Sequence, residues 1–473
     1  MRTVLLLLVL LTQTAFSQSG DAAARAAADD MQTVWMPEVT EDILDNGMRV
    51  IFTRVNDIPL AEINVIVDGG IMREPEDKPG VAYVVNHMLL RGSKDRSRDM
   101  IERRLDQLGS IVMPYVHYDY AQIYAKTLTR NFRSTLEVIA DAVQRPTFPA
   151  EQLLAFKQEA STRLVPSTRS AGERATLQTL NDLCGTMTAV TKSMLPSDAD
   201  VSARETTDLR AFHEQWYTPA STTLIIAGNL DFQFVRTLLI EQFGRWTPAA
   251  EPAETADPLP ARAEPSGTMQ VIDDTSTTKG LAYYRFGTTV PGRAAPDAAA
   301  LMVMHALFAE GDSSRLRQAM WGENVISPTF TSSLVFSREC SYMMISGSAP
   351  PVLADSIVSV TERVMTQLAS NPISDRELQR VKKSLLAESP LLFSSNRNLQ
   401  RLLKEAVVYG IPVGDAMCAR DHIARVTAQD VRRVAEKVLQ PDNFQVTVIG
   451  KGDVLRPRLE SLGRDVQVIE VEE

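Results

Sequence analysis

The sequence predicts an α+β fold made of two homologous halves. Strand-like and helix-like segments do not strictly alternate, which favours sheets covered by helices over a doubly wound parallel sheet. The chain has 473 residues, more than one ordinary domain needs. Anchor residues in its first half also recur in its second half at a nearly constant offset, which indicates an internal duplication.

The anchors are a proline before an apolar helix, a Pro-containing turn before a leucine, and a proline nine residues before a glycine. The offset is 219 residues from Gly92 to Gly311, 225 from Leu153 to Leu378 and 222 from Pro219 to Pro441. Three ordered anchors at nearly one spacing indicate that the two halves share one architecture.

Each half contains strands and helices. In the first half, β-branched apolar runs and a run ended by Gly228 predict strands at 48–53, 63–68 and 224–227. Helical spacing predicts helices at 99–108 and 136–143 and a third beginning near Pro149. The same criteria in the second half predict a strand at 343–346 and helices at 298–307 and 375–386. We expect two-layer halves, each an antiparallel-rich sheet with helices on one face.

The N-terminus is typical of an exported protein. Arg2 precedes the apolar run 4–11, and Ala15-Phe16-Ser17 forms a small-residue cleavage pattern, which predicts a signal peptide and a periplasmic or secreted protein. The run is too short for a stable span, and an uncleaved anchor is the alternative. The predicted organisation is a signal peptide (1–17), an N-terminal extension (18–37), a first half (38–248), a Pro-rich linker (249–267), a second half (268–455) and a C-terminal tail (456–473).

Charge and cysteines restrict the function further. The net charge of −10 and the absence of a basic stripe indicate no nucleic-acid partner. Cys184, Cys340 and Cys418 lack metal-ligand spacing. One disulfide with one free thiol is possible, but three buried free thiols is the preferred interpretation.

The apolar helix after Pro79 resembles the active-site helix of the pitrilysin/insulinase metallopeptidases, whose motif is His-x-x-Glu-His. There, two histidines one turn apart bind Zn²⁺ and the glutamate activates the metal-bound water. The matching residues are Tyr83, Asn86 and His87, so only the second histidine remains. The resemblance covers about 40–455 and implies two α+β halves that close like a clamshell over a peptide.

The other family positions have also changed. The resemblance places the distal zinc ligand, a glutamate, at Arg163, and Glu159 one turn away is a possible substitute. In the second half, Ser313-Ser314-Arg315-Leu316 matches the family, but its following Arg and Tyr fall at Trp321 and Pro328. The resemblance therefore implies that no catalytic residue and no metal site is retained.

The resemblance also identifies an edge strand that pairs with the substrate backbone. Its counterpart here is 113–116, and Pro114 removes one donor from that strand. The substrate-cleft candidates are Met113, Pro114, Tyr115, Ser313 and Arg315. The nearby 117–120 segment is predicted to be an alternating strand with outward polar residues.

The leading hypothesis is a non-catalytic family member that binds no cofactor. It would be the structural or substrate-holding partner of a catalytic homologue, or pair with itself, with extended peptides as possible ligands. One alternative is an active zinc peptidase with shifted ligands such as His87 and Glu159. Another is a peptide- or protein-binding scaffold without an enzymatic partner.

Overall fold

The computed structural model describes residues 37–55, 58–161, 170–185, 189–192, 194–247, 268–274, 280–322, 330–387 and 396–470. The predicted signal peptide, nearly all of the N-terminal extension and the linker lie outside these residues. Chain contacts separate Met1–Pro37 from Glu38–Glu473, and the second unit holds every helix and strand described below. Within the described residues, no helix is long and apolar enough to cross a bilayer.

The first sheet has the strand order β1-β2-β6-β3-β5-β4. All neighbours are antiparallel except β2 and β6, which are parallel. Strand β6 lies between β2 and β3, so the strands predicted at 48–53 and 63–68 are not paired with each other. The bounds are β1 (Val39–Ile43), β2 (Arg49–Arg54), β3 (Leu60–Val67), β4 (Ile111–Val116), β5 (Ala121–Leu128) and β6 (Thr222–Gly228).

The second sheet repeats this topology in the order β12-β7-β11-β8-β10-β9. Its outermost strand comes from the chain's end and is parallel to β7, whereas β1 is antiparallel to β2. The predicted C-terminal tail is therefore wrong, because 466–470 completes this sheet. The bounds are β7 (Met269–Asp273), β8 (Ala282–Thr289), β9 (Thr331–Val335), β10 (Tyr342–Ala349), β11 (Gln445–Gly450) and β12 (Val466–Glu470).

The helices also repeat in order. Those of the first half are α2 (Val81–Met88), α3 (Arg98–Leu108), α4 (Phe132–Gln144), α5 (Ala150–Ser161), α6 (Ala171–Cys184), α7 (Asp198–Ser202), α8 (Thr206–Trp216) and α9 (Phe232–Phe243). Those of the second half are α10 (Ala298–Phe308), α11 (Arg315–Gly322), α12 (Ala354–Ser370), α13 (Asp375–Ala387), α15 (Asn396–Tyr409), α16 (Val413–Met417), α17 (Ala419–Arg425), α18 (Ala428–Val438) and α19 (Gly452–Glu460). The predicted α+β class with two homologous halves is confirmed.

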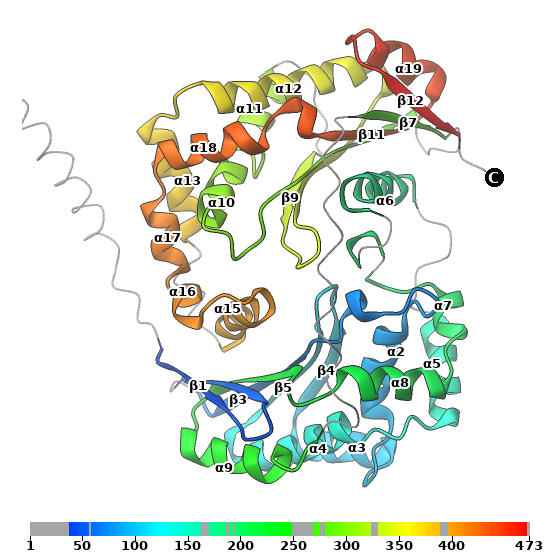
Figure 1. Ribbon diagram of the computed structural model, residues 1–473, viewed down its shortest axis with the longest axis vertical. Coiled ribbons are helices and arrows are strands. Elements are labelled where there is room, and N and C mark those ends of the chain that lie inside the picture. Colours follow the sequence, from blue (N-terminus) through cyan, green and yellow to red (C-terminus); the bar gives the residue numbers. More distant parts are fainter. Residues whose placement is uncertain are drawn as a thin grey trace, which may run out of the picture. The chain divides into compact units, whose positions relative to one another are not determined.

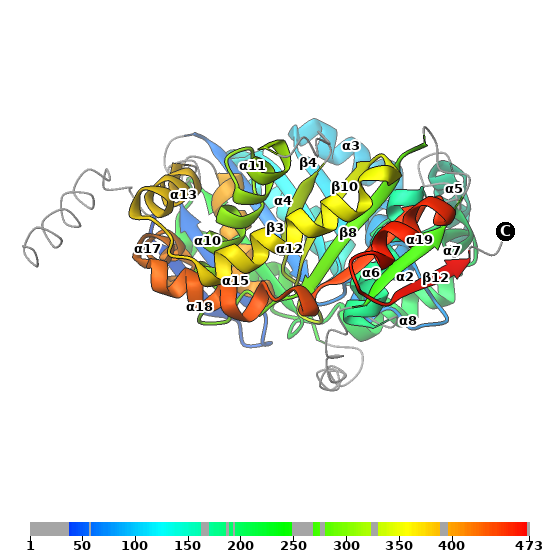
Figure 2. The ribbon, with the colours of Figure 1, turned by 90° about the horizontal axis from the view of Figure 1, so that it is seen from above.

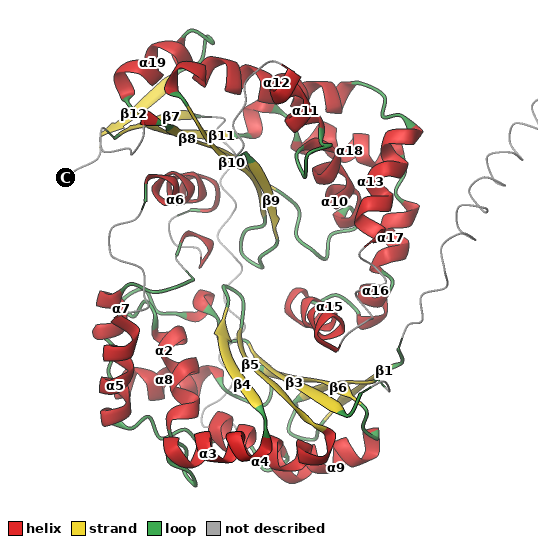
Figure 3. Ribbon diagram, turned by 180° about the vertical axis from the view of Figure 1, so that it is seen from behind, coloured by secondary structure: helices red, strands yellow, loops and turns green. Residues whose placement is uncertain are grey.

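Each sheet carries helices on both faces, one more layer than the sequence predicted. Helices α12 and α19 lie on one side of the second sheet and α6, from the first half, packs on β8 and β11 from the other side (Figures 1 and 2). Conversely, α15 from the second half packs on β3 and β6 of the first sheet (Figure 3). The helices are exchanged because the inner faces are apolar: Ile51, Ile66 and Ile225 form a buried cluster with α15.

A buried amide network fixes α15 on the first sheet. Gln400 of α15 donates to Glu62 O at 2.8 Å and accepts from Asn64, which in turn accepts from Gln122. Lys404, one turn later, donates to the Gln122 side-chain oxygen at 3.2 Å. A satisfied polar network in an apolar interface specifies the helix register, because shifting it would leave buried groups unpaired.

The loop Phe336–Cys340 between β9 and β10, here the junction loop, joins the second sheet to first-half elements and to α15. Asp119 accepts from Arg338 N at 2.9 Å and from Ser337 Oγ at 3.1 Å. The Arg338 guanidinium lies 2.8 Å from Asp68, and Glu339 accepts from Ala189 N. Side-chain and backbone contacts from this loop therefore fix the neighbouring elements.

The junction loop also carries a disulfide. Cys340 is bonded to Cys184 at the end of α6, with Cα atoms 5.8 Å apart, and Cys418 stays free. The preferred prediction of three free thiols was therefore wrong. The two cysteines are 156 residues apart, and only the docking of α6 on the second sheet brings them together.

Candidate functional site

The helix that carries the degenerate motif is α2, and a buried carboxylate fixes its start. Glu74 accepts hydrogen bonds from the backbone nitrogens of Gly80 and Ala82, each at 3.0 Å. Gly80 adopts a left-handed conformation with φ of 80°, which favours glycine. Burial raises the pKa of Glu74 to about 6, although both hydrogen bonds lower it. The frame of the helix is thus built independently of any metal.

Aromatic rings fill the position where the two histidines of the motif would meet zinc. The Tyr83 and His87 rings lie 4.1 Å apart, and Phe156 of α5 is 6.2 Å from the first and 5.8 Å from the second. His87 Nδ1 lies 2.9 Å from Tyr83 O, so this nitrogen donates to its own helix. The three rings form a packing cluster between α2 and α5.

Asn86, at the position of the catalytic glutamate, is fully buried and links the helix to the sheet. Its amide nitrogen donates to Tyr115 O at 2.8 Å and to Gln122 O at 3.1 Å. Tyr217 donates to its oxygen at 3.4 Å. The Asn86 amide cannot accept a proton from water as a carboxylate can. Its nitrogen and its oxygen both already have hydrogen-bond partners in the protein.

Glu159, the proposed substitute ligand, is held by two arginines. Arg91 binds it through two nitrogens at 2.5 and 3.2 Å, and Arg98 lies 3.3 Å away. Arg91 also lies over the Phe156 ring, 4.9 Å from its centroid. The hydrogen bond from Arg91 lowers the pKa of Glu159 to about 2. A metal ion would have to displace these two cations from the carboxylate.

The remaining positions of the second half are engaged elsewhere or not described. Arg315 forms a two-point ion pair with Glu377 of α13 at 2.7 and 2.8 Å, and Ser313 accepts from Arg380 of the same helix. Trp321 is 43% exposed under the guanidinium of Arg317. Arg163 and Pro328 lie outside the described residues. Arg315 and Ser313 are therefore both in contact with α13.

The zinc that the motif implies does not fit the side chains present. A tyrosine and an amide replace two of the three motif residues, and the nearby carboxylate has cationic partners. Within the part of the chain that the structure describes, no cluster of three or more His, Cys, Asp or Glu side chains could hold a metal ion. Structural and catalytic zinc sites need at least three such ligands.

The strand beside α2 presents an incomplete edge. His117 N donates to Tyr120 O at 2.8 Å, so odd-numbered residues of β4 bond to β5 and the backbone groups of Val112, Pro114 and Val116 point outward. Strand β4 is the last strand of its sheet. Pro114 therefore removes the central outward N–H. Met113 and Tyr115 are each 45% exposed. Tyr115 pairs with Gln122, whose side chain contacts Lys404 of α15, so these side chains lie on the same face of the sheet as α15.

The 117–120 segment was predicted to be an outward-facing strand, and this is wrong. It is the four-residue connection between β4 and β5, and Asp119 in it is completely buried. His117 stacks on Tyr120 at 5.0 Å, and the Lys404 ammonium lies 4.8 Å from the Tyr120 ring centre. The sequence carries no signal for this cluster, because Lys404 and the junction loop come from the other half.

Two regions of the chain match families of known proteins. Residues 49–181 match the family described as "Insulinase (Peptidase family M16)", and residues 205–385 match "Peptidase M16 inactive domain". The chain belongs to peptidase family M16. The M16 matches together include strands of both sheets, in agreement with the resemblance of the α2 motif.

Relatives and solved structures agree with the M16 assignment. The probable mitochondrial-processing peptidase subunit beta of Arabidopsis thaliana is 23% identical over 88% of this chain and 78% of its own length. An uncharacterized zinc protease of Mycobacterium leprae is 24% identical, covering 87% of this chain and 92% of that protein. The crystal structure of a peptidase M16 inactive domain from Pseudomonas fluorescens shares the fold, with a TM-score of 0.77, 20% identity and coverage of 87% and 98%.

Proposed function

We propose that this M16 protein is non-catalytic and acts as the structural or substrate-holding partner of a catalytic homologue. The observation that carries the proposal is Asn86, which occupies the position of the catalytic base and uses its amide to join α2 to the sheet. The Tyr83, His87 and Phe156 rings occupy the adjoining space. The peptidase frame is kept and its chemistry is replaced by packing.

The relatives support a partnered role. The Arabidopsis relative is named as a subunit of a processing peptidase, and thus as part of an assembly. A closed chamber needs two facing shells, and only one of them must supply the metal. We infer that this chain supplies a shell to a zinc-bearing homologue.

We also propose that the chain works outside the cytoplasm. The Cys184–Cys340 disulfide supports this, because disulfides persist in oxidising compartments and are rare in the cytosol. The N-terminal apolar run supplies an independent sequence argument.

The two alternatives differ in their support. A peptidase with shifted ligands requires Glu159, and the two arginines on that carboxylate argue against it. A peptide-binding scaffold without an enzymatic partner is favoured by the exposed Met113 and Tyr115 beside α2. The missing donor at Pro114 weakens peptide pairing without abolishing it.

The deciding experiment is an affinity pull-down of the tagged mature chain from its native host, with zinc quantified in the eluate. We expect a co-purifying M16 homologue with an intact His-x-x-Glu-His motif and about one zinc ion per pair. A lone chain with stoichiometric zinc and chelator-sensitive peptide cleavage would overturn the proposal in favour of shifted ligands. A lone chain without zinc would overturn the partner proposal in favour of the peptide-binding scaffold.

A further inference from the structure

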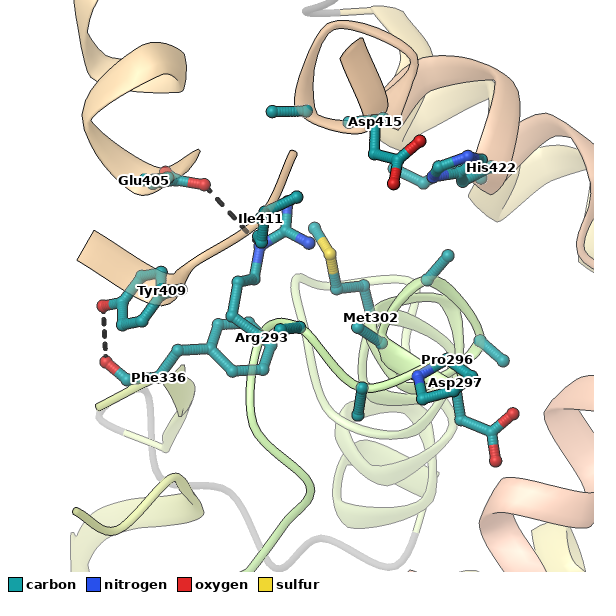
Figure 4. A pocket seen from close by; sticks show the side chains of 18 of the residues that line it. Arg293, Pro296, Asp297, Met302, Phe336, Glu405, Tyr409, Ile411, Asp415 and His422 are labelled. Atoms are coloured by element: carbon teal, nitrogen blue, oxygen red, sulfur yellow. Dashed lines mark hydrogen bonds and ion pairs between the residues drawn. The ribbon is translucent and has the colours of Figure 1, made fainter. Parts of the chain in front are cut away.

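A cavity of about 830 Å³ lies between the first turn of α10 and helices α15 to α17. Its volume is within the range of small-molecule sites. All of its lining residues belong to the second half, so it is separate from the degenerate α2 site. In Figure 4, Arg293 and Glu405 lie on one side of Met302, and Asp415 and His422 lie on the other.

Among the described residues of the first half, a direct contact occupies the corresponding place. Helix α2 is the counterpart of α10, and Pro196 before α7 is the counterpart of Pro412 before α16. A Cβ at Gly80 would lie 2.9 Å from the Pro196 Cβ, so the start of α2 packs directly on this proline. The carboxylate of Glu74 lies against the same turn and accepts from its N–H groups.

An extra helix distinguishes the second half. From Pro412 to Pro441 the chain advances 29 residues, but from Pro196 to Pro219 it advances only 23. The longer stretch contains α17, which has no counterpart between α7 and α8. Helix α17 lines the cavity together with Pro296 and Pro412. Their first-half counterparts are Pro79 and Pro196, and there Gly80 packs directly on Pro196. We infer that the insertion opens this space.

Small and apolar side chains line much of the cavity, beside charged side chains. Alanines supply much of the lining and leave the space unfilled, whereas a few longer apolar side chains supply contact area. Figure 4 shows Met302 and Ile411 near the centre of the view. The alanines that line the cavity are Ala294, Ala295, Ala298, Ala299, Ala300, Ala416 and Ala419, and the longer apolar residues include Met302, Leu385, Leu402, Ile411, Ile423 and Val426.

The charges favour an anion at one end. Arg293 lies 3.6 Å from Glu405, and Arg401 lies 4.0 Å from the same residue, so two guanidinium groups share one carboxylate. The Arg293 side chain is only 16% exposed. At the other end, Arg433 is paired with Asp297 and Asp430. Arg293 therefore lies in the segment that leads into α10, close to the start of the helix.

We propose that this cavity binds a small amphipathic carboxylate. Its carboxylate would pair with Arg293 at the end of the cavity where Arg401 also lies. Its apolar body would lie along Met302 and Ile411, against the alanine walls. This site does not depend on the peptidase-partner proposal, and either can fail alone.

The test is calorimetric titration of the full mature chain with dodecanoate below its critical micelle concentration. We expect saturable binding of one molecule, which Arg293→Gln weakens by about tenfold, because a charge-assisted hydrogen bond is lost. The matched variant Arg317→Gln removes an arginine paired with Asp312 outside the cavity and should bind like the wild type. Dodecylamine, with the same tail and opposite charge, should bind at least tenfold more weakly.

A second variant separates loss of the site from loss of the fold. Ala299→Phe places a ring in the cavity, and we expect it to abolish dodecanoate binding while the variant unfolds as cooperatively as the wild type. Undiminished binding to both Arg293→Gln and Ala299→Phe would place the ligand elsewhere and overturn the proposal. Absence of saturable binding to the wild type would overturn it as well.

Discussion

At the scale of single residues, the side chains at the positions that the family resemblance assigns to the motif make packing and hydrogen-bond contacts within the protein. Asn86 shows how: its partners are backbone carbonyls of two neighbouring strands, which a carboxylate could not satisfy. His87 keeps its identity but donates to the helix carbonyl one turn earlier. A residue's chemical role therefore follows from what its atoms contact, and the motif alone does not establish it.

Replacing Asn86 with the isosteric Asp should destabilise the fold. The change removes two donors from buried carbonyls and places an acid against them, so we expect a loss of about 2 kcal/mol in the free energy of unfolding. Urea denaturation measures it. As a control, Asn443→Asp changes an exposed amide that also donates to a carbonyl, and it should cost far less. Equal losses would show that Asn86 does not hold α2 to the sheet.

His213 should give the protein a pH-dependent stability. It is buried, its Nε2 lies 2.8 Å from Val143 O, and burial lowers its pKa from 6.5 to about 4. Between these values the unfolded chain binds a proton that the folded chain does not, so stability falls as the pH falls. The shift corresponds to a loss of about 3 kcal/mol by pH 4.

The variant His213→Gln should lose this contribution. Urea denaturation at about pH 7 and about pH 4 would show a smaller difference between the two conditions than in the wild type. The control His422→Gln, at an exposed position, should keep the wild-type difference. If His213→Gln lost as much stability between the two pH values as the wild type does, other groups would be the cause of the acid sensitivity.

At the scale of elements, edge strand β4 shows how one residue limits a surface. Its outward backbone groups belong to Val112, Pro114 and Val116, and the central one has no N–H. A strand added there loses one ladder hydrogen bond, and the same proline protects the edge from pairing with other chains. We therefore expect peptide binding at β4 to be weakened because the edge lacks one backbone donor, and not because of its side chains.

Replacing Pro114 with Val should restore the missing donor. We expect the affinity for a labelled extended peptide to rise by about two- to tenfold, the effect of one net backbone hydrogen bond. Fluorescence polarisation measures it. The control Met113→Val changes a residue whose N–H faces β5, and it should leave the number of outward donors unchanged. An unchanged affinity in Pro114→Val would mean that peptides do not pair with this edge.

At the scale of the whole molecule, the exchange of helices makes the two halves interdependent. Helix α6 covers the second sheet and α15 covers the first, so neither half buries its inner sheet face alone. The junction loop adds the Asp119 contacts and the disulfide. Separating the halves would expose both inner faces and unpair buried polar groups, which opposes large opening motions.

Removing the disulfide should weaken this arrangement. For the double variant Cys184→Ser/Cys340→Ser we expect a loss of about 2–5 kcal/mol in the free energy of unfolding, because the bond closes a loop of 156 residues. Guanidinium denaturation without reductant measures it. Cys418→Ser, which removes the free cysteine, should differ little from the wild type. A double variant as stable as the wild type would show that the polar contacts alone hold α6.

The sequence by itself determined the α+β class, the duplication and the M16 family, and it predicted the loss of the motif. These follow from local periodicity and from residue identity at fixed spacing, which need no knowledge of distant neighbours. Only the tertiary structure decided the partners of Asn86, the pairing of Cys184 with Cys340 and the burial of Asp119. It also revealed the exchanged helices and the cavity beside α17. Each depends on segments far apart in the chain, whose contacts are set by the burial of whole faces and leave no local pattern.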